Sequence, residues 1–417
     1  MKNLGENLLR SALLLVVLSL FSAVCLAASD KQPRKGRKPT VEIIWEAPAK
    51  VTRGGYPRVH RLNDGRLVMS YARSSNNYIR ISDDNGYTWS DMEYKVMSGF
   101  TWENGNGKAR LVASNPEFAQ LSEANPYHPG RIIFACNYRP TWLKHGVGDE
   151  HMSSVHPYTI SIKTSDDDGA TWSDVRHVYK SDLWKENVLR GCWEPFVLEL
   201  PDGTVQIYFA DETPYWRKKS KWQNISVIES YDGGDTWSAP RVVSQNAAHR
   251  DGMPVVAIHE GMLLMAVESS EPGMRLFPIL ISNPIEDNWS TPVRSDSPYR
   301  CHPFSKDLKS DIAYSGAPYI ITTDNFIVYS YQISDESDDK EDNDTKHCAM
   351  EVQVCPKSEL ENGCLQTLRA PSRPIDVDQW TENAVWNSLC DLGNDEILAI
   401  SQFNGWVHVV RGRVVMK

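Results

Sequence analysis

Three copies of one short turn pattern constrain the fold of this chain more than any other feature. The copies begin at Ser82, Ser165 and Ser230, and each fits S-x-D-x-G-x-T-W. Each follows a short run of alternating apolar residues, as a hairpin turn would. The Asp carboxylate can accept backbone N–H groups across a tight turn, the Gly allows a positive φ, and the Trp supplies a large apolar ring. Three copies indicate repeated β units.

A second pattern divides the chain into six units. Each unit has a strand entrance, a strand, a turn and a second strand, and the six entrances are Tyr56-Pro57, Asn115-Pro116, Glu194-Pro195, Met253-Pro254, Ala317-Pro318 and Trp386-Asn387. Proline suits a strand entrance because it lacks the ladder donor. Turn pairs such as Asp202-Gly203 suit two-residue hairpins. The stretch Val41–Trp45 precedes the first unit, and we expect it to add a strand to the last unit and close a ring.

The first residues of the chain have the composition of a secretory signal peptide. Lys2 and Arg10 precede an apolar run that ends in small residues, and the run is short for a membrane span. We therefore expect a signal peptide over 1–27, a basic linker over 28–40, and a secreted or periplasmic protein with no membrane contact after cleavage. Residues 41–417 are expected to form a single all-β domain and a monomer. A polar, Cys-containing insertion is expected around 333–375, and its acidic segment 334–361 is expected to be exposed.

Charge and cysteine content narrow the possible partners. The net charge of −10 disfavours nucleic acid as a partner. Seven cysteines follow the expected cleavage site; secretion permits disulfides, but their pairing cannot be read from sequence. No phosphate loop, Ser–His–Asp arrangement or metal-ligand spacing stands out, so we expect neither a cofactor nor a metal.

Two acidic residues are singular when equivalent positions of the six units are compared. Glu194 is the only acid at the strand entrance. Glu268 is the only acid at the end of the second strand, where the six residues are Ala72, Asn137, Ala210, Glu268, Gln332 and Gln402. Glycoside hydrolysis needs a pair of carboxyl groups flanking one bond. Glu212 and Asp251 are other acids nearby that could serve instead. The alternative without a function is that Glu194 and Glu268 are solvated residues at strand ends.

The turn pattern resembles the Asp box of the sialidase superfamily, which marks blades of a six-bladed β-propeller. That resemblance implies a sialidase-like propeller with its site where the innermost strands converge. Arg58 resembles the first of the three arginines that sialidases use for the sialate carboxylate. The fifth unit, Ser315 to Tyr319, offers no arginine, and Trp386 stands where sialidases show a tyrosine. Such a site should bind a sugar acid poorly, because a carboxylate is best held by fork-shaped guanidinium contacts.

The chain is more similar to glycoside hydrolase family 93, the exo-acting arabinanases. The similar stretches are Tyr56-Pro57-Arg58-Val59, Trp193-Glu194-Pro195-Phe196, Gly252-Met253-Pro254 with Ala266-Val267-Glu268, and Trp386-Asn387-Ser388-Leu389. The resemblance implies that Glu194 is the acid/base and Glu268 the nucleophile of a retaining exo-glycosidase that releases arabinan-type terminal sugars. The two carboxyl groups should then lie roughly 5–5.5 Å apart.

The partner implied by this reading is an oligo- or polysaccharide. The candidate substrate-binding residues are Arg58, Tyr56, Asn115, Trp193, Asp251, Tyr319 and Trp386. Packing between blades is the alternative role for the aromatic members. An exo-α-sialidase remains open and would need Arg250 and Arg300 to converge with Arg58. A non-catalytic carbohydrate- or protein-binding propeller also remains open, because fold alone does not decide function.

Overall fold

In the computed structural model of the protein, the described residues are 40–104, 107–141, 155–183, 190–215, 222–246, 250–270, 276–301, 314–334, 348–361, 364–365, 371–378 and 382–417. The chain divides into two compact units. One is Glu42–Val415, which holds the whole architecture discussed below. The other joins 1–41 with 416–417, and the expected signal peptide and nearly all of the linker lie outside the described residues.

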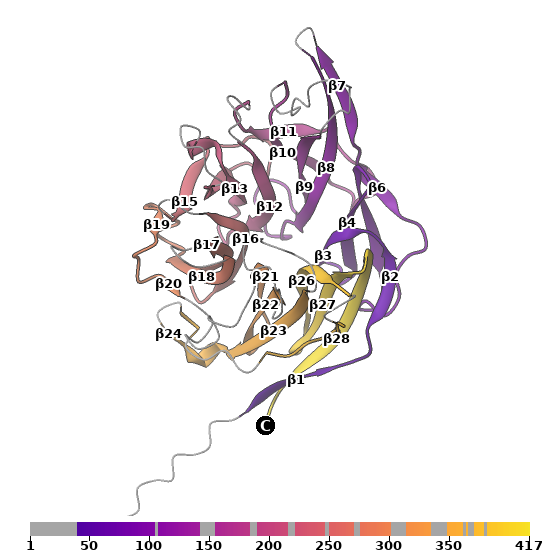
Figure 1. The fold of residues 1–417 in the computed structure, drawn as a ribbon, viewed down its shortest axis with the longest axis vertical. Helices are drawn as coiled ribbons and strands as arrows, with labels where there is room; N and C mark the ends of the chain where they lie inside the picture. Colours follow the sequence, from indigo (N-terminus) through magenta and orange to yellow (C-terminus); the bar gives the residue numbers. More distant parts are fainter. Residues whose placement is uncertain are drawn as a thin grey trace, which may run out of the picture. The chain divides into compact units, whose positions relative to one another are not determined.

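The unit Glu42–Val415 is a six-bladed β-propeller, as the repeat predicted (Figure 1). The first three strands of each blade pair antiparallel, and the inner strand lies nearest the centre of the ring. The six inner strands are β3 (Gly55–Arg61), β8 (Gly107–Gln120), β12 (Cys192–Glu199), β16 (Asp251–His259), β21 (Tyr314–Thr322) and β26 (Ala384–Gly393).

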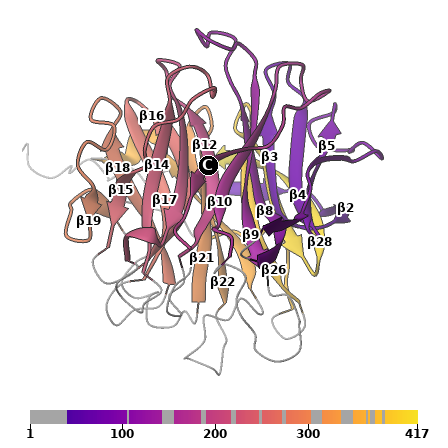
Figure 2. The same cartoon turned by 90° about the horizontal axis from the view of Figure 1, so that it is seen from above.

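The second and third strands of each blade follow outward from the centre. The second strands are β4 (Leu67–Arg73), β9 (Ile132–Thr141), β13 (Val205–Asp211), β17 (Met262–Ser270), β22 (Phe326–Ser334) and β27 (Glu396–Phe403). The third strands are β5 (Asn76–Ser82), β10 (Thr159–Ser165), β14 (Asn224–Ser230), β18 (Leu276–Pro284), β23 (Ala349–Pro356) and β28 (Trp406–Met416). In Figure 2 the strands of the blades run across one layer, with connecting loops at both of its faces.

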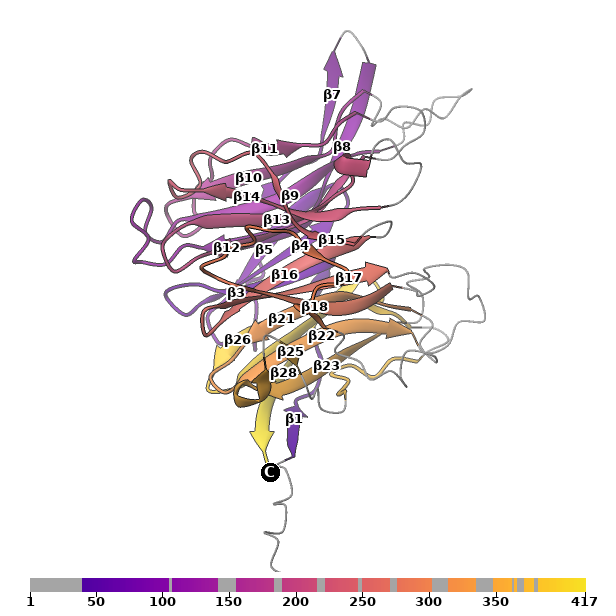
Figure 3. The same ribbon diagram turned by 90° about the vertical axis from the view of Figure 1, so that its left-hand side faces the viewer.

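Shorter strands complete the blades. The outer edges of the first four blades carry β6 (Tyr94–Met97), β11 (Arg176–Lys180), β15 (Arg241–Gln245) with β19 (Val293–Arg294), and β20 (Arg300–Cys301). β24 (Leu360–Glu361) and β25 (Cys364–Leu365) form a separate pair. In blade two, β7 (Phe100–Asn104) pairs with the start of β8, and this hairpin projects beyond its neighbours (Figure 3).

The last blade is closed by the start of the chain. β1 (Val41–Trp45) and β2 (Ala49–Arg53) both pair with β28. The expected role of Val41–Trp45 is therefore confirmed, and β2 adds a second closing strand. This pairing covers an edge that would otherwise expose unpaired backbone groups. Among the described residues, no helix is long and apolar enough to cross a membrane.

The hydrophobic core lies between neighbouring blades. Val68 and Ile79 of blade one pack with Phe118 and Phe134 of blade two in one buried cluster. Similar clusters join blade two to blade three and blade six to blade one. Because side chains alternate along each strand, one face of every sheet meets the next blade. The inner strands are thereby held rigidly around the centre.

The three turn patterns form the same hydrogen-bonded turn, as predicted. In the first, Asp84 accepts the Thr88 N–H at 2.8 Å and the Thr88 hydroxyl at 2.6 Å, and the Gly86 N–H donates to Ser82 Oγ at 2.8 Å. Gly86 has a φ of 86°. The other two copies repeat these contacts around Asp167 and Asp232. Each turn connects the third and fourth strands of its blade, away from the centre.

The stretch expected as an exposed polar insertion is partly a core element. Within it, β23 (Ala349–Pro356) is buried at every position and pairs with β22 along its full length. The expectation of exposure was wrong for this strand because its polar residues hid the pattern. Glu351 accepts hydrogen bonds from the Tyr331 hydroxyl and from Arg373, so its charge is compensated inside the blade.

Candidate active site

Six equivalent β-bulges surround the centre of the propeller. The pairing of each inner strand with its second strand shifts register at the same place, for example between Gly55 and Arg58 in blade one. The bulge residues have φ values between 46° and 55°, and they are Tyr56, Asn115, Glu194, Met253, Ala317 and Trp386. A left-handed conformation is uncommon for residues other than glycine. Its sixfold repetition is a built feature that sets one side chain per blade at the same level.

A cavity of about 300 Å³ opens at this level. Its lining residues come from blades one, two, three and six, and they are Gly55, Tyr56, Ser114, Asn115, Arg139, Trp193, Glu194, Trp386 and Gln402. The volume is at the lower end of the range for ligand pockets. The rings of Tyr56 and Trp386 lie 6.0 Å apart at 38° on one side of it. Aromatic walls with a few polar groups suit the apolar faces and hydroxyl groups of a sugar.

Glu194 is the one acid among the residues lining this cavity. It is half-buried, and its Oε2 accepts the Met253 N–H at 3.2 Å. Burial, followed by the charge of Glu268, raises the pKa of Glu194 to about 7, although Arg250 and the Met253 amide oppose the shift. A carboxyl group with a pKa near 7 can hold a proton and release it at neutral pH, as a general acid must.

Glu268 lies on β17 of blade four, the blade next to that of Glu194, and its side chain reaches the bulge of blade five. It is 3% exposed, its Oε2 accepts the Ala317 N–H at 3.1 Å, and it forms an ion pair with Arg250. It does not line the cavity itself, but its charge acts on Glu194. The arrangement therefore pairs a carboxyl group of raised pKa with a second carboxylate that is held by a cation.

The position of Glu268 also has a structural role in the repeat. In the next blade, the equivalent Gln332 accepts the Trp386 N–H at 2.8 Å, just as Glu268 accepts the Ala317 N–H. Both side chains satisfy the amide of a neighbouring bulge. Gln332 shows that this hydrogen bond needs no charge, so the carboxylate of Glu268 and its arginine partner go beyond what the bulge requires.

Arg250 and Tyr314 complete the surroundings of Glu268, and the sequence comparison of acids missed both as site residues. Arg250 is 28% exposed at its side chain and is flanked by the charges of Glu268 and Glu194. The Tyr314 hydroxyl accepts a hydrogen bond from Gln332 at 2.9 Å. Burial, followed by the charge of Glu268, raises the pKa of Tyr314 well above its ordinary value. Both residues stand three positions before a bulge residue, so comparing that position across units would have found them.

Arg58 was expected to bind substrate, but it does not line this cavity. It is 3% exposed, pairs with Glu117 at 3.4 Å, and lies under the ring of Tyr56 at 4.0 Å from its centroid. The correction follows from the bulge, which turns Tyr56 toward the cavity and leaves Arg58 one level deeper. Asp251, another expected substrate-binding residue, does not line the cavity either. It is fully buried and accepts two 2.9 Å hydrogen bonds from Arg300.

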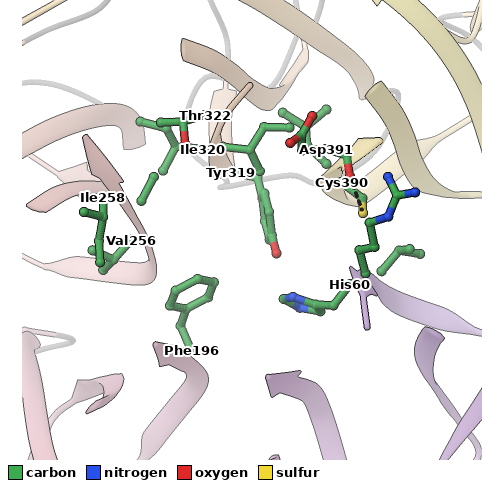
Figure 4. A pocket seen from close by; sticks show the side chains of 14 residues that line it. His60, Phe196, Val256, Ile258, Tyr319, Ile320, Thr322, Cys390 and Asp391 are labelled. Atoms are coloured by element: carbon green, nitrogen blue, oxygen red, sulfur yellow. Dashed lines mark hydrogen bonds between the residues drawn. The ribbon is translucent and has the colours of Figure 1, made fainter. Parts of the chain in front are cut away.

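Tyr319 belongs to a different cavity. This one has a volume of about 340 Å³ and lies further along the inner strands, where Phe196, Val256 and Tyr319 line it (Figure 4). The rings of Phe196 and Tyr319 meet at 6.4 Å. Because Tyr319 lies two residues beyond its bulge residue, it shares the deeper level of Arg58, whose guanidinium lies 5.3 Å from its ring centroid. A contact between Tyr319 and a substrate stays a prediction.

The three arginines considered for a sialate site are each paired with a carboxylate. Arg58 pairs with Glu117, Arg250 with Glu268 and Arg300 with Asp251. Arg58 and Arg300 are each 3% exposed at the side chain. Four expected residues do line the cavity with Glu194, namely Tyr56, Asn115, Trp193 and Trp386. Within the described part of the chain, no cluster of three or more His, Cys, Asp or Glu side chains could hold a metal ion.

Known structures with this architecture include glycosidases. The GH93 α-L-arabinofuranosidase of Fusarium graminearum, solved with arabinobiose, is 18% identical with a TM-score of 0.59 over 89% of this chain and 98% of that one. A protein of unknown function from Dyadobacter fermentans is 13% identical with a TM-score of 0.61, over 90% and 99%. The Hadza microbial sialidase Hz136 is 14% identical with a TM-score of 0.52, over 88% and 66%. At these identities the likeness concerns the fold.

Sequence comparison gives the family. A search of curated proteins found no match. The sequence profile of the BNR repeat-like domain matches residues 62–295, which is more than half of the 417 residues. That stretch contains all three turn patterns and both candidate carboxyl groups, Glu194 and Glu268. The chain therefore belongs to the BNR repeat-like domain family and has the sialidase-like propeller fold that GH93 arabinanases and sialidases share.

Proposed function

We propose that the protein is an exported, exo-acting glycoside hydrolase that releases terminal neutral sugars, of the arabinan type, with retention of configuration. The observation that carries the proposal is the pairing of Glu194, with a pKa near 7, and Glu268, which forms an ion pair with Arg250. Two carboxyl groups whose surroundings push their protonation apart are what such a reaction requires.

Each carboxyl group has one role in the first step. The Glu268 carboxylate forms a bond to the anomeric carbon while the bond from that carbon to the leaving oxygen breaks. The Glu194 carboxyl group gives its proton to the leaving oxygen. In the second step a water oxygen displaces Glu268, and Glu194 takes the proton from that water. Arg250 forms an ion pair with Glu268.

The position of the cavity supports an orientation for the substrate. Glu194 lies on the wall of a cavity formed by blades one, two, three and six, whereas Glu268 lies between blades four and five. A sugar reacting between the two carboxyl groups would therefore direct its leaving group into the cavity. Tyr56, Trp193 and Trp386 would then contact the glycan that leaves.

The charges around the site favour a neutral sugar over a sialic acid. Two of the three arginines considered for a sialate carboxylate are buried in ion pairs, and the third is paired with Glu268. A sialate carboxylate would compete with Glu268 for Arg250. Breaking a buried pair leaves an uncompensated charge, which is strongly unfavourable.

The proposal is tested with three substrates and two variants. The purified protein is assayed on linear arabinan, an aryl arabinofuranoside and an aryl sialoside, with Glu194→Gln and Glu268→Gln as controls. We expect arabinose release that each substitution lowers by at least about 100-fold, because proton transfer alone contributes about that much. Release that survives both substitutions, or cleavage of the sialoside alone, would contradict the proposal. Absence of cleavage of any glycoside would favour a binding propeller.

A further inference from the structure

Arg139 is the one cation among the residues that line the cavity beside Glu194. It lies near the end of β9, two residues after Asn137, which occupies the Glu268 position in its own blade. Side chains two residues apart on a strand point to the same face. The second strand runs antiparallel to the inner strand, so its last residues come up beside the bulge level where Glu194 stands.

The guanidinium of Arg139 is available to a ligand. The side chain is exposed, and across the described residues it makes neither a hydrogen bond nor an ion pair. The arginines considered earlier, Arg58, Arg250 and Arg300, are all committed to carboxylates. Arg139 thus differs from them in offering its five donors to whatever enters the cavity.

The surroundings of Arg139 are those of a sugar subsite. Trp193, which shares the cavity wall, packs against Tyr158 with ring centroids 4.7 Å apart, and Tyr158 lies within the electrostatic influence of Arg139. An aromatic surface beside a cation can hold a sugar ring while the cation takes an acidic substituent. A carboxylate matches a guanidinium best, because two parallel N–H···O bonds can form.

We propose that Arg139 binds the carboxylate of a uronic acid residue in the leaving part of the glycan. The substrate class is then a neutral terminal sugar joined to an acidic glycan, and this inference rests on the proposed function for the orientation of the chain. The net charge of −10 disfavours binding of an acidic glycan to the protein surface in general. Binding of a polyanion would therefore need a local cation, which Arg139 supplies in this cavity.

A matched pair of ligands tests the inference without turnover. α-1,4-linked trigalacturonate and α-1,4-linked galactotriose differ in having carboxylates or hydroxymethyl groups at the same positions. Titration calorimetry of the full chain at low salt should show that trigalacturonate binds at least tenfold more tightly. Arg139→Gln should weaken trigalacturonate binding roughly 10- to 100-fold and leave galactotriose binding unchanged. The preference should shrink as salt is added.

Arg110→Gln is the matched control. Arg110 is exposed in the same blade, donates to Ser75 Oγ at 3.0 Å, and does not line the cavity. This variant should retain the preference for trigalacturonate. The inference is overturned if wild type shows no such preference, or if Arg139→Gln binds trigalacturonate as tightly as wild type.

The two proposals can fail separately. Arabinan cleavage that depends on Glu194, without any preference for trigalacturonate, would overturn the inference on Arg139 and support the proposed function. A preference for trigalacturonate that depends on Arg139, with no glycoside cleaved, would support the acidic subsite and overturn the proposed hydrolase.

Discussion

Arg250 and Tyr314 occupy the same position in neighbouring repeats, three residues before the bulge residue, and both bear on Glu268. Arg250 forms an ion pair with it from its own blade. Tyr314 belongs to the next blade and feels the Glu268 charge. The same place in the repeat thus supplies a cation on one side of the carboxylate and a phenol on the other. Gly316 lies beside the Glu268 carboxylate and the Tyr314 hydroxyl.

Replacing Gly316 by alanine should disturb this arrangement. A Cβ there would lie 2.5 Å from Glu268 Oε2 and 2.7 Å from the Tyr314 hydroxyl. We expect a loss of about 1–3 kcal/mol in unfolding free energy, together with reduced activity. Chemical denaturation measures the first and arabinose release the second. Tyr314→Phe removes one of the two crowding atoms, so the double variant should lose less than the sum of the single variants. Strict additivity would show that the two sites do not touch.

Glu194 should destabilise the folded protein at alkaline pH. Its folded pKa of about 7 lies above the ordinary value of 4.5, so the folded state binds its proton more tightly than the unfolded state does. The associated stability is present below about pH 4.5 and is lost as pH rises to 7. Glu194→Gln cannot ionise, and it should therefore gain about 1–3 kcal/mol relative to wild type between pH 4.5 and 8.

Thermal melting of the two proteins at pH 4.5, 6 and 8 measures this difference. Glu229→Gln serves as a comparison because Arg241 and neighbouring amides hold the pKa of Glu229 at about 2, below its ordinary value. That substitution should instead cost stability at neutral pH. A difference between wild type and Glu194→Gln that does not change with pH would contradict the raised pKa of Glu194.

The pH dependence of activity should report the same group. If Glu194 donates the proton, kcat/KM falls as pH rises through about 7. Burial and the Glu268 charge raise this pKa, whereas Arg250 opposes them, so Arg250→Met should move the alkaline limb to higher pH. Activity should also fall, because Glu268 loses its partner. A pH profile that stays in place in Arg250→Met would separate Arg250 from Glu194.

Repeat symmetry made much of the architecture predictable from sequence. The three turn patterns and the six strand entrances gave the blade number, and the bulge residues are the residues compared at those entrances. The symmetric comparison singled out Glu194 and Glu268, and the structure places Glu194 in a cavity with Tyr56, Asn115, Trp193 and Trp386. Local rules sufficed here because every unit repeats the same hydrogen bonds.

The sequence did not predict which residues line the cavity where this depends on their depth along the propeller axis or on their ion-pair partners. Arg58 and Tyr319 lie two residues beyond their bulge residues, and that offset moves them below the cavity. Asp251 was a candidate because it lies near the strand entrance of unit four in the sequence, but its carboxylate is paired with Arg300 of β20. Arg139 was not identified as a site residue, and Arg250 was considered only for a sialate site, because only two positions of each unit were compared and both residues lie at other positions of the repeat.

The turn patterns should contribute to stability and leave the chemistry untouched. Asp84 accepts both the N–H and the hydroxyl of Thr88, and these bonds hold the pKa of Asp84 below its ordinary range. The neighbouring Asp83 is exposed and takes no part in the turn. Asp84→Ala should cost about 1–2 kcal/mol of unfolding free energy, since the hydrogen bonds from Ser82 Oγ and from the N–H and hydroxyl of Thr88 are lost. Asp83→Ala should stay within about 0.5 kcal/mol of wild type. Because the folded pKa of Asp84 is depressed, its contribution is present at neutral pH and is lost as pH falls through the acid range. Urea denaturation at pH 7 and pH 3 measures both effects, and the two variants should differ less at pH 3 than at pH 7. Equal losses in the two variants at pH 7 would show that the carboxylate of Asp84 does not hold the turn.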